Sequence, residues 1–148
     1  MNMNLDLEET TKRLMSLDPE ADYTDEELEQ YDDLSDELIR QYSWPEVYKT
    51  WSNYLYTQCP DEQDVIWFAH NFFAYSPDSS IPDPVHFTAY LYYRVDTSLN
   101  EDAYQIFDSV AIKVLENSGV INMMNTPLWT AETDPRIQAE ISVLKSRR

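Results

Sequence analysis

The side chains best suited to covalent chemistry near neutral pH are one cysteine and two histidines: Cys59, His70 and His86. Cys59 directly precedes an expected helix start, a position that lowers a thiol pKa, and a nearby histidine would complete a nucleophilic pair. Neither histidine has the spacing to a second ligand that a zinc-binding helix shows. We expect instead that His70 lies at the core edge among phenylalanines, that His86 is exposed, and that Cys59 is a small helix-end residue. The chain is therefore not expected to be an enzyme.

The acidic residues that follow residue 17 partly match the spacing of a calcium-binding loop. Six oxygen-bearing residues fall at ligand positions of that loop: Asp18, Glu20, Asp22, Thr24, Glu26 and Glu29. The match fails at Tyr23, where the sharp turn requires glycine, and Pro19 also stands inside the loop. Residues 24–29 fit the start of a helix better. We expect neither a bound metal nor any other cofactor.

The composition of the 148-residue chain removes further classes of function. A single glycine excludes the glycine-rich loops that bind phosphates and dinucleotides, and a single cysteine excludes both internal disulfides and multi-cysteine metal sites. The formal net charge of −18 repels phosphate, so direct binding of nucleic acid or of an anionic membrane is not expected. The apolar share of 43% nevertheless suits a globular domain with a hydrophobic core.

The negative charge is concentrated near the N-terminus, and this concentration is the main functional signal. Residues 18–37 contain 11 acidic side chains and no basic one. On a helix, four of these acids share one line, with others beside them: Asp25, Glu29, Asp32 and Asp36. Like charges at i,i+4 cost about 0.2–0.5 kcal/mol per pair, so stability alone would favour scattered lysines. The residues predicted to contact a partner are Asp25, Glu26, Glu29, Asp32, Asp33, Asp36 and Glu37.

This acidic stretch predicts a surface that occupies the basic surface of another protein. The line of four acids covers about 16 Å at ~1.5 Å rise per residue, which spaces the charges by about 5 Å. A DNA strand places phosphates about every 3.4 Å, and the flanking acids bring the two charge densities close. We therefore expect a DNA-mimic-like inhibitor or regulator of a nucleic-acid-handling enzyme. Phage-encoded inhibitors of host defence and acidic immunity proteins against nuclease toxins have this physical profile.

A second interpretation assigns the charge to solubility alone and the function to aromatic residues. Aromatic side chains make up 14% of the chain, and tyrosine is favoured at interfaces. Four tyrosines lie outside the expected core stripes and are predicted to be half-exposed: Tyr54, Tyr56, Tyr90 and Tyr93. In this alternative the protein is a structural or adaptor module that forms a homodimer through these side chains.

Helix signals along the chain predict the elements that must position these side chains. Thr24 and Glu27 form a capping box before a helix expected at residues 25–41. Further N-caps are expected at Ser43, Asp83, Asn100 and Asp134. Other helices are expected at residues 4–17 and 44–58 and in segments beginning near residues 60, 84, 100 and 135. The predicted fold is all-α, an irregular single-domain bundle of about six to seven helices, with helical-hairpin pairs as an alternative.

Apolar side chains at steps of three and four residues predict which helix faces are buried. In the helix at residues 25–41, the expected stripe begins at Leu28. The helix that begins near residue 60 is expected to bury Phe73 together with its other large apolar residues. In the helix at residues 44–58, the expected stripe is Trp44, Val47, Tyr48, Trp51 and Leu55.

The same signals divide the chain into two parts. Residues 1–23 are expected to form an acidic N-terminal helical arm and linker, and residues 24–148 the helical core domain. The first 17 residues lack the cationic start and apolar run of a signal peptide, and no stretch is long and apolar enough to cross a bilayer. We therefore expect a cytoplasmic protein.

Overall fold

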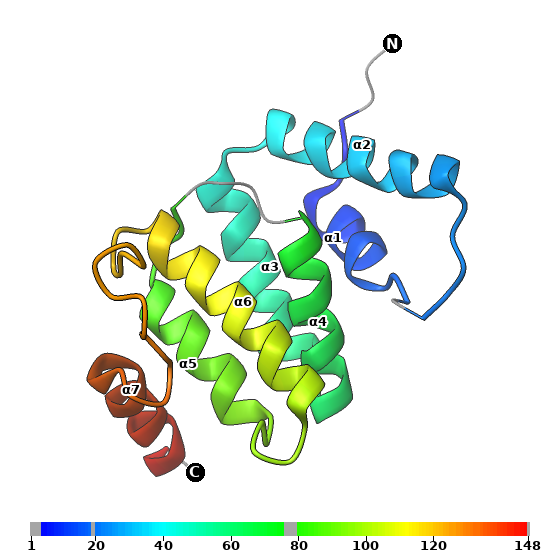
Figure 1. The fold of residues 1–148 in the computed structure, drawn as a ribbon. Helices are drawn as coiled ribbons and strands as arrows, with labels where there is room; N and C mark the ends of the chain where they lie inside the picture. Colours follow the sequence, from blue (N-terminus) through cyan, green and yellow to red (C-terminus); the bar gives the residue numbers. More distant parts are fainter. Residues whose placement is uncertain (1–3, 19, 76–79, 148) are drawn as a thin grey trace.

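The structure, a computed structural model, describes residues 4–18, 20–75 and 80–147. Within these ranges the chain forms seven α-helices and no strand, so the predicted all-α bundle is confirmed. The helices are α1 (Leu7–Met15), α2 (Asp25–Gln41), α3 (Trp44–Gln58), α4 (Glu62–Tyr75), α5 (Pro84–Arg94), α6 (Glu101–Asn117) and α7 (Pro135–Ser146). Helices α3 to α6 form the body of the bundle, α2 crosses one end and α7 lies beside α5 (Figure 1).

Capping residues set helix starts as the sequence predicts. The Thr24 hydroxyl accepts a hydrogen bond from the Glu27 backbone N–H at 3.1 Å, and the Glu27 carboxylate accepts one from the Thr24 N–H at 3.2 Å. Asn100 caps α6 by accepting a hydrogen bond from the Ala103 N–H at 3.0 Å. Such caps satisfy backbone donors that have no partner inside the helix, and each contributes about 1 kcal/mol. Helix α2 consequently spans the predicted residues 25–41.

Asp83 occupies the predicted N-cap position of α5, but it does not cap the helix with its side chain. Asp83 adopts a left-handed conformation with a φ of 48°, and its side chain makes no capping hydrogen bond. An N-cap side chain reaches the first-turn N–H groups from an extended backbone, which Asp83 does not have. Pro84 still sets the start of α5, because its fixed φ suits the first helical position and it has no N–H to satisfy.

An aromatic core holds α3, α4, α5 and α6 together. Trp51, Phe72 and Phe87 are fully buried, and Phe72 lies between the other two rings at centroid distances of 5.9 Å and 4.8 Å. Phe107 adds α6 to the same cluster. The stripe predicted for residues 44–55 is buried throughout. Because burying one such ring contributes about 1.5–3 kcal/mol, these contacts supply much of the stabilising free energy.

Helix α1 is joined to this core at its C-terminal end. Leu14 and Met15 are buried, and the Asn71 amide of α4 donates hydrogen bonds to the carbonyls of Met15 and Leu17, each at 3.2 Å. A buried amide is costly unless it is paired, so these two bonds fix the end of α1 against α4. The segment predicted as an arm therefore contributes apolar side chains to the core.

A second apolar cluster joins α7, and the loop before it, to α5 and α6. Its buried members are Ala89, Leu115, Ala131 and Ile137. The loop at residues 120–134, predicted to be irregular, contains no helix and supplies one of these residues. The cluster packs α7 against the face of α5 that points away from the aromatic core (Figure 1).

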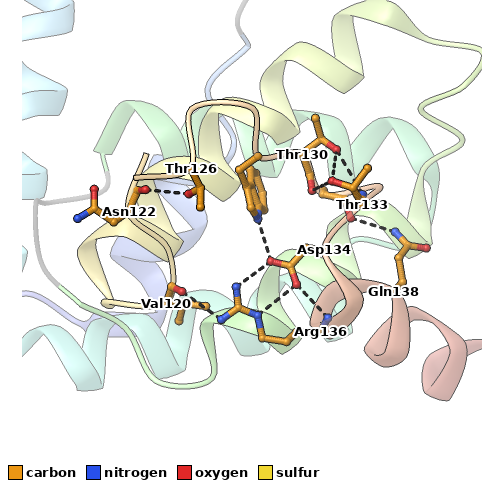
Figure 2. Close-up of polar contacts among 10 residues, drawn as sticks. Val120, Asn122, Thr126, Thr130, Thr133, Asp134, Arg136 and Gln138 are labelled. Atoms are coloured by element: carbon orange, nitrogen blue, oxygen red, sulfur yellow. Dashed lines mark hydrogen bonds and ion pairs between the residues drawn. The ribbon is translucent and has the colours of Figure 1, made fainter. Parts of the chain in front are cut away.

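Asp134 organises this loop from a buried position (Figure 2). Its carboxylate accepts hydrogen bonds from the Trp129 indole at 2.8 Å, from the Arg136 backbone at 2.9 Å and from the Arg136 guanidinium at 2.9 and 3.1 Å. The same guanidinium donates to the Val120 carbonyl at 3.0 Å, which ties the two ends of the loop together. These donors, above all the Arg136 side chain, lower the pKa of Asp134 to about 2.

Two residues predicted to be buried are exposed. Leu28 is 45% exposed because the core contacts of α2 begin only at the half-buried Tyr31, and Ser35 is the first buried residue of that helix. Phe73 is 47% exposed because its neighbour Phe72 takes the core position, and successive residues on a helix point about 100° apart. Lys113 covers part of this ring, with its ammonium group 5.6 Å from the ring centroid.

Replacing Thr88 by valine should stabilise the protein. Thr88 is fully buried in α5, and its hydroxyl has no hydrogen-bond partner among the described residues. An unpaired buried hydroxyl costs about 1–3 kcal/mol, so the methyl group of valine should raise the free energy of unfolding by about 1 kcal/mol. Urea denaturation measures the change, with Thr88→Ala as the control that opens a cavity. A loss of stability in Thr88→Val would contradict the assignment.

Replacing Asp134 by asparagine should destabilise the protein by about 2 kcal/mol near neutral pH, because the amide cannot replace the charged hydrogen bonds. The folded-state pKa of about 2 lies below the ordinary value of 3.8, so this contribution is complete above about pH 4 and is lost as the pH falls through 2. Urea denaturation of both proteins across this range should therefore show the difference shrinking toward acid. A difference that does not depend on pH would contradict an ionised Asp134.

Candidate protein-binding surface

Helix α2 carries the predicted binding residues on a side that the bundle leaves open. Only Ser35 and Leu38 of its 17 residues are buried. Six of the seven predicted residues are exposed, and we call them the acidic face: Asp25, Glu26, Glu29, Asp32, Asp33 and Asp36. Within the part of the chain that the structure describes, none of these six carboxylates forms an ion pair.

Glu37, the seventh predicted residue, differs from the other six. It is half-buried, and its carboxylate accepts hydrogen bonds from the Arg40 guanidinium at 2.6 Å and from the Gln41 amide at 2.9 Å. Its charge is therefore partly neutralised within the helix. Glu27, which was not among the predicted residues, is likewise occupied in the capping box.

The C-terminal end of α2 attaches the helix to the bundle. Leu38 is buried, the Gln41 side-chain oxygen accepts a hydrogen bond from the Leu5 N–H at 2.7 Å, and the Tyr42 hydroxyl donates to the Leu5 carbonyl at 2.6 Å. Figure 1 shows the helix lying across the end of the bundle, away from α5 and α7. The fold thus holds α2 through the part of the helix from Tyr31 onward and leaves its acidic face to solvent.

The electrostatics of α2 change along its length. Asp25 and Glu26 lie in the first turn, where the positive end of the helix dipole favours acids. Asp32, Asp33 and Asp36 lie beyond that turn and gain nothing from it. Their repulsion from acids one turn away costs about 0.2–0.5 kcal/mol per pair, so this arrangement has no basis in folding stability.

The structure does not support the nucleophile chemistry considered for Cys59. Cys59 is buried at the end of α3, not at the start of α4, so no helix N-terminus stabilises its thiolate. Burial, with a smaller contribution from Asp64, raises the pKa of this thiol to about 12. In the described residues Cys59 forms no hydrogen bond with either histidine, and its carbonyl accepts one from Arg94 at 2.9 Å.

Both histidine placements predicted from sequence are wrong. His70 is exposed, because on α4 it faces away from the buried positions Ala69 and Phe72. His86 is half-buried, because α7 packs beside it: its Nδ1 lies 2.7 Å from a Glu140 carboxylate oxygen, and its ring meets the edge of Tyr56 at 5.7 Å. His86 therefore links α5 to α7 and lies outside the acidic face.

The four tyrosines of the alternative interpretation are all half-buried, as predicted. Tyr56 and Tyr90 meet edge-to-face at 4.6 Å, and Tyr93 lies 6.3 Å from Tyr90. Burial raises the pKa of Tyr56 to about 12. Tyr56 and Tyr90 thus cover the edge of the core between α3 and α5, whereas Tyr54 stacks on Phe68 of α4 at a centroid distance of 6.2 Å. The part of these rings in self-association stays a prediction.

Two grooves open on the surface, and sequence reasoning missed both. The first, of about 510 Å³ between α1 and α3, carries both signs of charge through Glu8, Lys12, Glu46 and Lys49. The second, of about 500 Å³ between α4 and α6, is lined by Glu20, Trp67, His70, Asp102 and Gln105, among others. A signal for the second groove was present, because Trp67 and His70 are spaced to share a helix face opposite the buried stripe.

Known proteins offer no guide to the role of this surface. Comparison of the chain with known protein families, with curated proteins and with solved structures gave no match. In the described residues no group of three or more histidine, cysteine or carboxylate side chains is arranged to hold a metal ion. None of the helices described combines the length and the apolar character needed to cross a membrane.

Replacing Asp33 by lysine should stabilise the protein. The change removes the repulsion of Asp33 from Glu29 and Glu37 and places a cation between the two acids, one turn from each. Four pair terms of about 0.2–0.5 kcal/mol predict a gain of about 1 kcal/mol in the free energy of unfolding, and about half of that for Asp33→Asn. Thermal unfolding at low and high salt measures the gain, which salt should reduce. Destabilisation by both variants would contradict unrelieved repulsion.

Proposed function

We propose that this protein binds the basic surface of another protein through the acidic face of α2. Its partner is a nucleic-acid-handling enzyme, and the bound protein inhibits or regulates that enzyme by occupying the surface that receives nucleic acid. Binding requires no cofactor, and the protein itself catalyses no reaction.

The observation that carries this proposal is the exposure of six unpaired carboxylates on a helix with only two buried residues. Their repulsion opposes folding, and a basic partner would relieve it. Along α2, four acids spaced by about 5 Å, with their neighbours, approach the density of phosphates at about 3.4 Å along a DNA strand. A cleft lined with lysine and arginine would therefore accept the helix in place of a nucleic acid strand.

The large net negative charge of −18 supports the same function in a second way. Opposite fields on two proteins steer their encounter and raise the association rate, an effect that salt screens. Acidic inhibitors of phage origin and immunity proteins against nuclease toxins are proteins of this physical type. We extend to this chain only their mode of action, the occupation of a basic site.

The test is capture of the partner from a lysate of the source organism on immobilised protein, followed by competition with duplex DNA. A partner held through a nucleic-acid site should be released by moderate salt and by the duplex, and its activity on nucleic acid should fall when this protein is added. Capture of proteins that neither the duplex nor salt releases would contradict the proposal. So would a captured enzyme that stays fully active.

Charge reversal locates the binding surface. The variant with Asp32, Asp33, Asp36 and Glu37 changed to lysine should lose partner capture, because the interaction turns repulsive, while circular dichroism shows unchanged helix content.

The matched control changes four exposed acids on other elements to lysine, so that the net charge is the same: Glu9, Glu62, Glu101 and Glu132. This control should retain most of the capture, because its acidic face is intact. Equal loss in both variants would show that total charge, not the acidic face, governs binding. Light scattering of the unaltered protein measures its oligomeric state and so tests the adaptor alternative, because that alternative requires a dimer.

A further inference from the structure

The groove between α4 and α6 is lined by an indole ring together with two acidic side chains. Trp67 lies on α4 and is 37% exposed, whereas the residues on either side of it, Ile66 and Phe68, are buried. Glu20 and Asp102 line the same groove of about 500 Å³. Among the described residues, neither carboxylate forms an ion pair, and no ring or cation packs on the indole.

Glu20 is an exposed residue that lies close in sequence to the anchored end of α1. The buried Asn71 amide of α4 holds the carbonyls of Met15 and Leu17, and Glu20 follows three residues later. The Glu20 N–H donates a hydrogen bond of 2.9 Å to the Asp18 carboxylate. Glu20 therefore stands over α4, in the acidic segment that leads directly into α2.

Apart from the imidazole of His70, the ionisable side chains that line this groove are acidic. The described residues that line it include two carboxylates and no lysine or arginine. The groove between α1 and α3 has similar volume but is lined by Lys12 and Lys49 as well as Glu8 and Glu46, so it favours neither sign. Of these two grooves, the α4–α6 groove alone combines an exposed indole with acidic side chains that no lysine or arginine offsets.

We infer that the α4–α6 groove binds an arginine side chain of the basic partner, an inference that rests on the proposed function. A guanidinium group is planar and weakly hydrated, so it stacks on an indole face while its N–H groups donate to carboxylates. An ammonium group lacks the planar geometry for both contacts at once. The acidic face attracts the partner through long-range electrostatic interaction, and the groove binds one arginine side chain of that partner.

The experiment observes the four tryptophan indole N–H signals by NMR during titration with the peptide acetyl-Gly-Arg-Gly-Arg-Gly-amide. Trp67→Phe identifies the Trp67 signal. This signal should shift and saturate as the arginine peptide is added. The same peptide with lysine in place of arginine should bind more weakly. The same peptide with uncharged citrulline in place of arginine should move the signal little. The signals of Trp44 and Trp51, which are buried, should stay in place.

The double variant Glu20→Gln, Asp102→Asn should weaken arginine-peptide binding by about fivefold, because each exposed pair contributes up to about 1 kcal/mol. The matched control Glu9→Gln, Glu132→Gln removes the same number of charges outside the groove and the acidic face, and it should change binding by less than about twofold at physiological salt. The four-residue lysine variant of α2 separates the two proposals, because retained partner capture by that variant, together with normal peptide binding, would overturn the function of α2 alone. A Trp67 signal that does not move, that moves equally with citrulline, or that ignores the double variant would overturn the arginine site.

Discussion

Mutual repulsion among the acids of residues 18–37 is the constraint on which the rest of the structure depends. These 11 charges, with no base among them, must remain in water, so α2 buries only Ser35 and Leu38. The stabilising free energy has to come from elsewhere. It comes from the aromatic core of α3 to α6, from the caps, and from hydrogen bonds such as those that tie Leu5 to the end of α2.

The prediction of helices from the sequence succeeded where local chemistry decides the outcome. Capping residues and apolar spacing predicted α2 at residues 25–41 and the buried face of α3, because both signals act within a few residues. Periodicity does not reveal where along a helix the core ends, which is why Leu28 was misplaced. It also does not reveal which helix will cover a neighbour, and for this reason the contact between His86 and Glu140 was not predicted.

The candidate site, like the fold, was predictable from the sequence only in part. The exposure of the acidic face follows from composition, since no apolar surface could have buried so many charges together. The α4–α6 groove does not follow, because Glu20, Trp67 and Asp102 come from three separate segments that only the packed bundle brings together. The two proposed surfaces have separate tasks: the acidic face supplies long-range attraction, and the groove supplies selectivity among basic groups.

The central claim is that the acidic face replaces the charge of nucleic acid on a basic partner. The most direct measurement is the affinity of the purified complex as a function of salt concentration, for the unaltered protein and for the four-residue lysine variant of α2. We predict that log Kd rises steeply with log salt for the unaltered protein and that the variant binds too weakly to show this slope. An affinity independent of salt, or an equal slope in the variant, would contradict the claim.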